Sequence, residues 1–320
     1  MILITGATGL IGKQLVTRLL AADQPVRVIV SPSRLHGTHT SHLPWSGVAE
    51  VVPGELTNAD VLHQVLADVH TVFHLAGAQW WGRRRDLQRV DVLTTQAVIA
   101  AARAARIGRI VIVSHLGAAQ SSAFTLLQIK GQVEELVRTS GLAYTIIRSG
   151  VVFGPDDRFV NGIATLLRAN PFLYFQAGQG ETLLNPLYVA DLAEALARTL
   201  ALLDTVDQTI EIGGPEYLSY NELIRTVMRV TGAPRNIVTL PPYLMRSWTG
   251  LTRRLFPHWP VTGQWYDMLA ANRTASLGTL ETVFGIQPAR FEDTILMYMR
   301  QRRYAPQLWR AVLQRRAGHA

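Results

Sequence analysis

The stretch "ILITGATGLIGKQLV", residues 2–16, decides the fold of this chain of 320 residues. An apolar run leads into Gly6, Gly9 and Gly12, and an amphipathic helical pattern follows them. In such a turn the first glycine permits the sharp bend, the second lets the backbone approach a pyrophosphate, and the third lets helix and strand pack closely. The helix N-terminus then offers amide donors to phosphates. We therefore predict a dinucleotide-binding turn with contacts at Gly6, Thr8, Gly9, Leu10, Ile11 and Gly12.

Short apolar runs alternate with helical patterns over the first 150 residues. Strands are expected at 2–5, 26–30, 50–52, 71–75, 109–114 and 143–148, with helices at 10–22, 86–105 and 128–139. Near-continuous apolar strands separated by helices indicate a parallel sheet that is covered on both faces. We expect an α/β fold, a Rossmann-like doubly wound parallel sheet whose ligand lies outside the carboxyl ends of the strands.

The alternation loosens after about residue 150. Helical patterns are expected at 157–169, 189–203, 219–231, 262–272 and 290–303, with one further strand at 208–212. We expect 1–150 to form an NAD(P)-binding Rossmann domain. Residues 151–320 would form an interleaved, mostly helical substrate or partner region with a basic C-terminal tail, since six Arg and no acid follow Thr294.

The composition excludes several classes of function. With 48% hydrophobic residues the chain can bury a sizeable core, and without cysteine it has no disulfide, thiolate zinc site or cysteine nucleophile. The 29 Arg and 2 Lys exceed the 23 acidic residues, giving a formal net charge of +8. No nucleic-acid-binding motif accompanies this charge, so we expect no nucleic-acid partner. No spacing of His and carboxylate residues is typical of a metal site, so none is expected.

The segment 240–269 mixes Trp, Leu and Phe with Arg, as interfacial segments do. It is interpreted either as a lid over the substrate pocket or part of the core, or as a contact with a membrane surface or hydrophobic partner, together with the basic tail. No apolar run reaches the roughly 18 residues that a spanning helix needs. Because the first strand starts at residue 2, no targeting peptide is expected. We expect a cytoplasmic protein, with peripheral membrane contact as the alternative.

The end of the second strand bears on cofactor choice. The sequence there, "VRVIVSPSRLHG" (26–37), offers Ser31, Ser33 and Arg34 and no acid. An acid would bond the ribose 2′-hydroxyl, whereas hydroxyls and a guanidinium suit a 2′-phosphate. We therefore predict that NADP(H) is favoured over NAD(H). The alternative is a solvated loop with Arg34 directed away.

Longer motifs carry a family resemblance. They are "TGATGLIG", "VVPGELTNADVLHQVLADVHTVFHLAG", "NPLYVADLAEAL" and "EIGGPEYLSYNELI". Over residues 1 to about 230 the chain resembles the extended and atypical short-chain dehydrogenase/reductase superfamily. It is most similar to the NmrA-like branch, which includes the nucleotide-binding accessory subunit of respiratory complex I and photosystem II assembly factors. "FGPDDRFVNG" and "FGIQPARFED" point to the complex I subunit type.

The resemblance implies further cofactor contacts by position. Glu55 and Leu56 fall where the family has Asp-Leu beside the adenine, although Glu is longer by a methylene. Leu75, Ala76 and Gly77 fall where the backbone lies along the cofactor.

The resemblance also implies catalytic positions. Ser114 matches the serine that polarises the substrate carbonyl, and Lys130 matches the lysine that bonds the nicotinamide ribose. The tyrosine that carries the proton is replaced by Leu126, which has no acid–base chemistry. His115 is an alternative proton donor, although a histidine at a strand end is commonly packed. "GAQWWGRRRD" (77–86) is interpreted as a wall of the substrate pocket or as a solvated capping loop.

Two functions remain open. The first is an NADP(H)-dependent oxidoreductase, acting without the usual tyrosine on a carbonyl or quinone-like apolar substrate. The second is a non-catalytic NADPH-binding assembly factor or accessory subunit, whose partner is a protein of a membrane redox complex.

Overall fold

The computed structural model describes residues 1–35, 47–78, 84–255 and 261–300. The chain divides into two compact units. Unit 1 comprises Met1–Ser149, Val189–Ile212 and Gly278–Gln287, and unit 2 comprises Gly150–Tyr188, Gly213–Leu277 and Pro288–Ala320. The units therefore interleave along the sequence, and the first change between them falls after Ser149. The predicted division into 1–150 and 151–320 stays a prediction.

Unit 1 is built on a parallel sheet of seven strands in the order β11-β6-β5-β4-β1-β2-β3. The strands are β1 (Ile2–Thr5), β2 (Val26–Val30), β3 (Glu50–Pro53), β4 (Thr71–His74), β5 (Arg109–His115), β6 (Ala143–Ser149) and β11 (Gln208–Ile212). All six pairings are parallel. β1 lies between β2 and β4, so the strand order reverses beside it. This reversal is where doubly wound sheets bind ligands.

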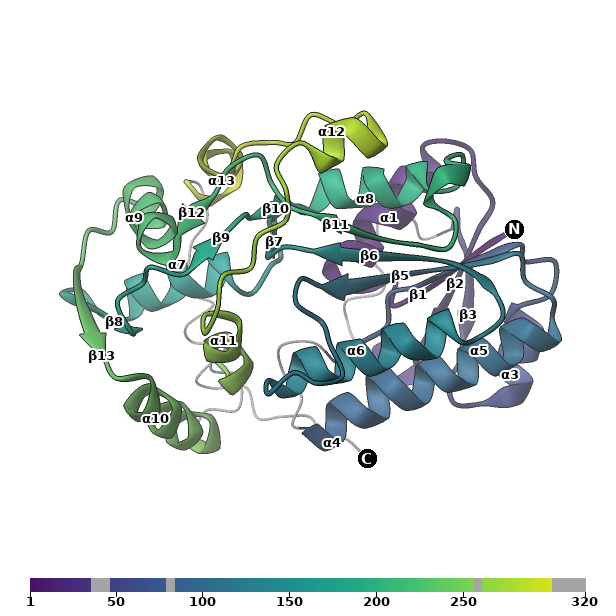
Figure 1. Ribbon diagram of the computed structural model, residues 1–320, viewed down its shortest axis with the longest axis horizontal. Helices are drawn as coiled ribbons and strands as arrows, with labels where there is room; N and C mark the ends of the chain where they lie inside the picture. The colour runs from purple at the N-terminus through teal and green to yellow at the C-terminus, as the bar shows by residue number, and fades with distance from the viewer. Residues whose placement is uncertain (36–46, 79–83, 256–260, 301–320) are drawn as a thin grey trace. The chain divides into compact units, whose positions relative to one another are not determined.

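Helices cover both faces of this sheet. They are α1 (Leu10–Leu20), α2 (Pro32–Leu35), α3 (Ala59–Val65), α4 (Arg84–Leu87), the π-helix η2 (Gln88–Leu93), α5 (Thr94–Ala104), α6 (Thr125–Arg138), α8 (Val189–Arg198), the 3₁₀-helix η3 (Leu203–Thr205) and α12 (Thr279–Phe284). In Figure 1, α3, α5 and α6 lie on one side of the sheet, and α1 and α8 lie on the other. The predicted Rossmann-like doubly wound fold is thus confirmed.

The predicted helix at 86–105 is not regular. It consists of the end of α4, the π-helix η2 and then α5. A π-turn changes the direction of the side chains that follow it, and such turns are frequent at functional sites. Asp91 lies within this π-helix, and its carboxylate is buried.

Unit 2 combines short strand pairs with helices. Its elements are β7 (Val152–Phe153), α7 (Val160–Ala169), β8 (Leu173–Ala177), β9 (Leu183–Leu184), β10 (Leu187–Tyr188), β12 (Leu218–Ser219), α9 (Tyr220–Thr231), β13 (Asn236–Leu240), α10 (Pro242–Leu255), α11 (Gly263–Met268) and α13 (Phe291–Met299). α9 begins with a full capping box, in which Ser219 and Glu222 satisfy each other's backbone amides. α9 packs on α7 and α13.

Candidate functional site: the carboxyl edge around β1 and β4

The glycine turn has the close contacts that its sequence requires. Gly6 has φ +72°, and a Cβ there would lie 2.6 Å from the backbone of Leu75 and Ala76. A Cβ on Gly12 would lie 2.3 Å from the Gly6 carbonyl oxygen. At Gly9 an added Cβ would meet a single neighbour within 4 Å, the same oxygen at 3.2 Å. Strand, helix and the end of β4 therefore approach each other as only glycine allows.

Helix α1 starts directly after this turn with Gly9 as its N-cap. Thr8, Leu10 and Ile11 are half-buried there. The first amides of a helix lack intrahelical partners, and the first turn of α1 carries no acidic residue. These amides suit the phosphates of a dinucleotide, because nothing anionic on the first turn competes with them.

A chain of hydrogen bonds joins the glycine turn to the π-helix. The Thr95 hydroxyl donates to the Asp91 carbonyl at 2.6 Å, so it must accept from His74 Nε2 at 3.0 Å. His74 Nδ1 then accepts from the Thr5 hydroxyl at 2.8 Å, which itself accepts from the Ala76 amide at 3.3 Å. The chain fixes the Nε2–H tautomer of His74. It ties the ends of β1 and β4 to the helix that carries Asp91.

His74 is neutral in this environment. Its imidazole is fully enclosed, and burial lowers its pKa from 6.5 to about 4. The nearby Lys130 cation adds to this lowering, and Asp91 partly opposes it. A protonated ring would carry a hydrogen on Nδ1 and would need an acceptor there. In this network the Thr5 hydroxyl donates to Nδ1, so the hydrogen bonds fit the neutral form.

Lys130 and Asp91 form a buried ion pair. The distance from Nζ to Oδ1 is 2.7 Å, and both side chains are almost inaccessible to solvent. The other carboxylate oxygen, Oδ2, accepts from the Ala78 amide at 2.8 Å. A Cβ on Gly77 would lie 3.3 Å from Lys130 Nζ, so the ammonium lies directly against the backbone after β4. The structure thus brings Lys130 together with Leu75, Ala76 and Gly77.

A small cavity of about 20 Å³ connects these groups with the glycine turn. Its lining includes Ile11, Leu75, Ala76, His74, Asp91 and Lys130. Leu126 does not line it and is buried one helical turn before Lys130. Where the resembling enzymes have a phenol, this chain therefore has packed hydrocarbon.

Ser114 lies near the end of β5. It pairs in register with Arg148 of β6, so both side chains face α6, and Ser114 does not line the cavity. Its hydroxyl is buried beside Glu134. Burial alone would raise the pKa of the Glu134 carboxyl. The hydrogen bonds from Arg148 and Arg138, together with the nearby Ser114 hydroxyl, outweigh burial, so this pKa lies below its ordinary value. The catalytic role of Ser114 stays a prediction.

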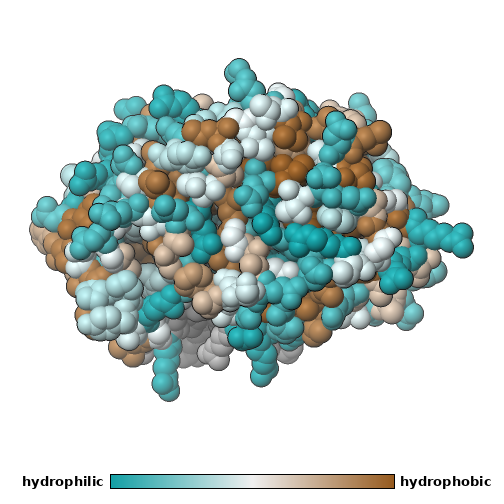
Figure 2. Space-filling view, in the orientation of Figure 1, coloured by the Kyte–Doolittle hydropathy of each residue, from teal (hydrophilic) through white to brown (hydrophobic). Residues whose placement is uncertain are grey.

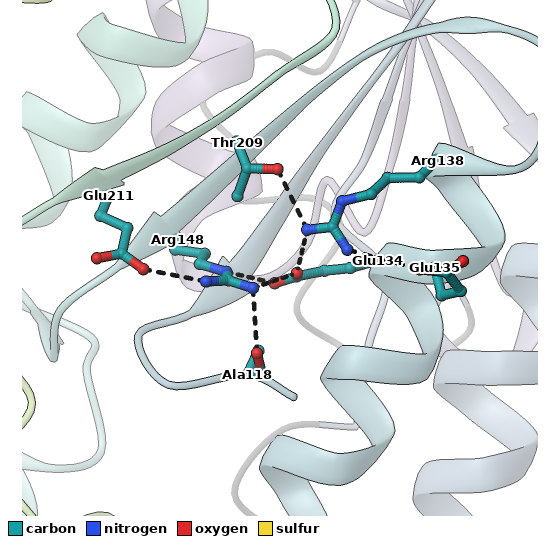
Figure 3. Close-up of polar contacts among 7 residues, drawn as sticks. All are labelled: Ala118, Glu134, Glu135, Arg138, Arg148, Thr209 and Glu211. Carbon is teal, nitrogen blue, oxygen red and sulfur yellow. Dashed lines mark hydrogen bonds and ion pairs between the residues drawn. The ribbon is translucent and has the colours of Figure 1, made fainter. Parts of the chain in front are cut away.

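The Glu134 cluster anchors the loop between β5 and α6 (Figure 3). Arg148 donates to Glu134 at 2.8 Å and to the Ala118 carbonyl at 3.1 Å, and it also pairs with Glu211 at 3.0 Å. Arg138 donates to Glu134 at 2.7 Å. The loop also approaches α6 closely, because a Cβ on Gly131 would lie 2.3 Å from Ala119. The cluster thereby helps to hold the helix that carries Lys130.

The adenosine end of the predicted site holds an acid. The Ser31 hydroxyl, at the end of β2, donates to the carboxylate of Glu55 at 2.5 Å and lies 2.9 Å from the Ser33 hydroxyl. Leu56 beside it is half-buried. The side chain of Arg34 lies outside the described part. A carboxylate from the loop after β3 therefore lies beside the end of β2, whose own sequence has no acid.

Several other predictions concern neighbouring segments. His115 is buried. Of the segment 77–86, residues 79–83 lie outside the described residues, while Arg84 and Arg85 are exposed. The basic tail beyond Arg300 is likewise outside them. Within the described ranges, no group of His, Asp and Glu could hold a metal ion, and no helix is long and apolar enough to cross a membrane.

Sequence reasoning missed Asp91 and His74. A histidine inside the apolar strand "TVFHL" and an aspartate in the apolar stretch "VDVL" were the available signals, because buried polar groups need partners. Their partners lie 39 and 69 residues away, so the pattern could not identify them.

Known proteins resemble this chain in sequence. The model of a family described as NAD(P)H-binding matches residues 6–169, just over half of the chain. Subunit 9 of the NADH dehydrogenase [ubiquinone] 1 alpha subcomplex from Rattus norvegicus is 28% identical, over 80% of this chain and 68% of its own. The photosystem II assembly factor Ycf39 of Guillardia theta is 27% identical, over 78% and 76%. A ceramide reductase of Caulobacter vibrioides is 28% identical, over 78% of each.

Solved structures resemble it in fold. The UDP-glucose 4-epimerase of Thermotoga maritima has a TM-score of 0.71 at 18% identity, covering 98% of this chain and 99% of the epimerase. The UDP-glucose 4-epimerase of Thermus thermophilus has a TM-score of 0.70 at 19% identity, covering 94% and 99%. These structures show the same fold, and the sequence relatives are of the kinds to which the resemblance pointed, a complex I subunit and a photosystem II assembly factor.

Proposed function

The chain belongs to the NAD(P)H-binding family, and on this premise we propose that unit 1 binds a nicotinamide dinucleotide across the carboxyl ends of β1 and β4. The observation that carries the proposal is the glycine turn. It sets the start of an 11-residue helix, without an acid in its first turn, against the end of β4. The pyrophosphate would lie on the first amides of α1, and the nicotinamide end would extend towards Lys130.

The proposed activity is that of an oxidoreductase acting on a carbonyl or quinone-like apolar substrate. A bound NADPH or NADH would supply the hydride. Lys130 would bond the nicotinamide ribose, since its ammonium lies against the backbone at Gly77. It is also our candidate proton donor, because Leu126 cannot carry a proton. The predicted role of Ser114 in orienting the substrate gains no support from its place beside Glu134.

The second candidate is a non-catalytic NADPH-binding accessory subunit or assembly factor of a membrane redox complex. The packed, buried Leu126 at the tyrosine position favours it. The relatives include a subunit of a mitochondrial NADH dehydrogenase and a photosystem II assembly factor, which supports a partner of this kind. The predicted cytoplasmic location stays a prediction.

Cofactor choice is a separate proposal. Ser31, Ser33 and Arg34 support the predicted preference for NADP(H). Glu55 acts against it, because a carboxylate repels a 2′-phosphate and accepts from a 2′-hydroxyl.

Fluorescence titration with NADPH and NADH tests the shared premise. We expect binding by the wild type and at least tenfold weaker binding by Lys130→Met, equivalent to about 1.4 kcal/mol. Glu135→Gln, an exposed position on the same helix, is the control and should bind as the wild type does. No binding of either cofactor by the wild type would refute both candidate functions.

A turnover assay separates the two candidates. Oxidation of NADPH with a panel of aldehydes and quinones, lost in Lys130→Met and kept in Glu135→Gln, supports the oxidoreductase. Cofactor binding without turnover of any member of the panel favours the accessory protein.

A further inference from the structure

Helix α10 of unit 2 presents apolar side chains to solvent. Tyr243 is 68% exposed, Leu244 47%, Trp248 69% and Leu251 61%. The spacing of Leu244, Trp248 and Leu251 is i, i+4 and i+7, so these three lie on one face of the helix. On the face of the molecule seen in Figure 2, hydrophobic residues are interspersed among hydrophilic ones. On α10 they follow one another along a single side. Isolated exposed apolar residues are ordinary, whereas a continuous face marks an interaction surface.

The opposite face of α10 satisfies its own packing with polar groups. Thr249 is buried, and its hydroxyl lies 2.8 Å from the hydroxyl of Tyr266 on α11. Arg246 forms an ion pair with Asp267, also on α11. The helix is thus held to unit 2 mainly through its less apolar side. Large apolar residues usually stabilise a fold by being buried in its core. Leu244, Trp248 and Leu251 are exposed, so they do not contribute to the core of unit 2 in this way.

The charge on the helix indicates which partner fits. Between Pro242 and Leu255 the sequence contains Arg246, Arg253 and Arg254 and no acidic residue. Arg254 is exposed and follows Leu251 by three residues, which places its backbone at the border of the apolar face. A basic helix with Trp and Leu on one side is typical of segments that lie in the interface of an anionic bilayer. Trp and Tyr rings are also enriched at the headgroup level.

The segment 240–269 was interpreted as a lid or as a membrane or partner contact, and the structure separates its aromatic residues. Trp265 is 3% exposed, and its indole nitrogen donates to the Tyr220 hydroxyl at 3.3 Å, so it belongs to the core of unit 2. Trp248 is free of such packing. Residues 256–260 lie outside the described residues, and within the described part of the segment the exposed apolar face is that of α10.

We propose that α10 binds the surface of an anionic lipid bilayer, with Leu244, Trp248 and Leu251 inserted among the headgroups and the exposed Arg254 paired with lipid phosphates. This inference does not depend on cofactor binding. It assigns a second surface to the protein, on unit 2.

Vesicle flotation of the full-length protein tests the proposal. The probes are vesicles of phosphatidylcholine alone and of phosphatidylcholine mixed with phosphatidylglycerol. We expect the wild type to float with the mixed vesicles and to bind more weakly as salt is added, because the arginine contribution is screened. Trp248→Glu and Leu251→Glu should each weaken binding by about tenfold or more, since each removes one inserted apolar side chain.

Leu203→Glu is the matched control. Leu203 is 79% exposed in the 3₁₀-helix η3 of unit 1, so the same substitution adds the same charge at a surface leucine outside α10. This variant should float like the wild type, and thermal melting should confirm that all variants are folded. Three results would overturn the proposal: a wild type that does not float with the anionic vesicles, equal flotation of Trp248→Glu and the wild type, or self-association that Trp248→Glu abolishes.

Discussion

Protonation of His74 should destabilise unit 1 by an amount that the structure defines. In the unfolded chain this histidine takes up its proton near pH 6.5, whereas burial delays protonation in the folded protein to about pH 4. Stability is therefore complete above pH 6.5 and falls as the pH is lowered towards 4, because the unfolded state binds more protons in that window. One pKa unit corresponds to about 1.4 kcal/mol, so the loss amounts to about 3 kcal/mol.

The variant His74→Gln isolates this effect. Glutamine keeps a donor and an acceptor for Thr95 and Thr5 but does not titrate. We expect it to lose about 1 kcal/mol above pH 7, because its hydrogen bonds are less well placed than those of the ring. Below pH 7, the free energy of unfolding of the variant should change less with pH than that of the wild type. The two curves should converge and then cross as the pH falls.

Urea denaturation at a series of pH values, from about pH 8 to about pH 4, measures both curves. The wild-type curve alone is not diagnostic, because Asp157 of unit 2 acts in the opposite direction. Burial raises its pKa to about 6, so its contribution is lost as the pH rises. Asp157 is present in both proteins, and only the difference between the curves reports His74. Parallel curves over this range would refute the proposed neutral, buried role of His74.

The remaining predictions concern charge pairs and glycines. Lys130→Met should lower the free energy of unfolding by about 3–5 kcal/mol, because it leaves the Asp91 carboxylate buried without its cation. Urea denaturation measures the loss, and an unchanged free energy of unfolding would contradict the stabilising ion pair. Glu55→Gln should tighten NADPH relative to NADH by about tenfold in paired titrations, and an unchanged ratio would place Glu55 away from the 2′ position. Gly12→Ala should abolish binding of both cofactors and lower the melting temperature, since its Cβ would overlap the Gly6 carbonyl. By contrast, Gly250→Ala, where a Cβ meets nothing within 4 Å, should stabilise α10 by about 0.5–1 kcal/mol.

Much of unit 1 could be predicted because its signals are local. The glycines of the turn from Gly6 to Gly12 are close neighbours in the sequence, and each buried strand is a short apolar run. Helix α10 was not predicted, although Leu244, Trp248 and Leu251 have helical spacing, and the sequence does not show that this apolar face is exposed. Residues 86–105 were expected as one helix because a π-turn has no periodic signal of its own.

Two tryptophans show that residue type alone does not predict whether a side chain is buried or exposed. Trp248 and Trp265 occur in the same Trp- and Arg-rich segment, and the sequence gives no reason to separate them. Packing against Tyr220 buries Trp265, while Trp248 faces outward. The difference arises because α10 and α11 each pack one side against the rest of unit 2. Which side that is depends on the arrangement of several elements.

The sequence by itself determined the doubly wound fold, the glycine turn for a dinucleotide and the loss of the tyrosine at Leu126, since each follows from neighbouring residues. Only the tertiary structure decided which charges meet. It paired Lys130 with Asp91, turned Ser114 towards Glu134 and brought Glu55 to Ser31. These contacts join residues that are distant along the chain, and their strength depends on burial and on distances of a few ångströms, which no local pattern encodes.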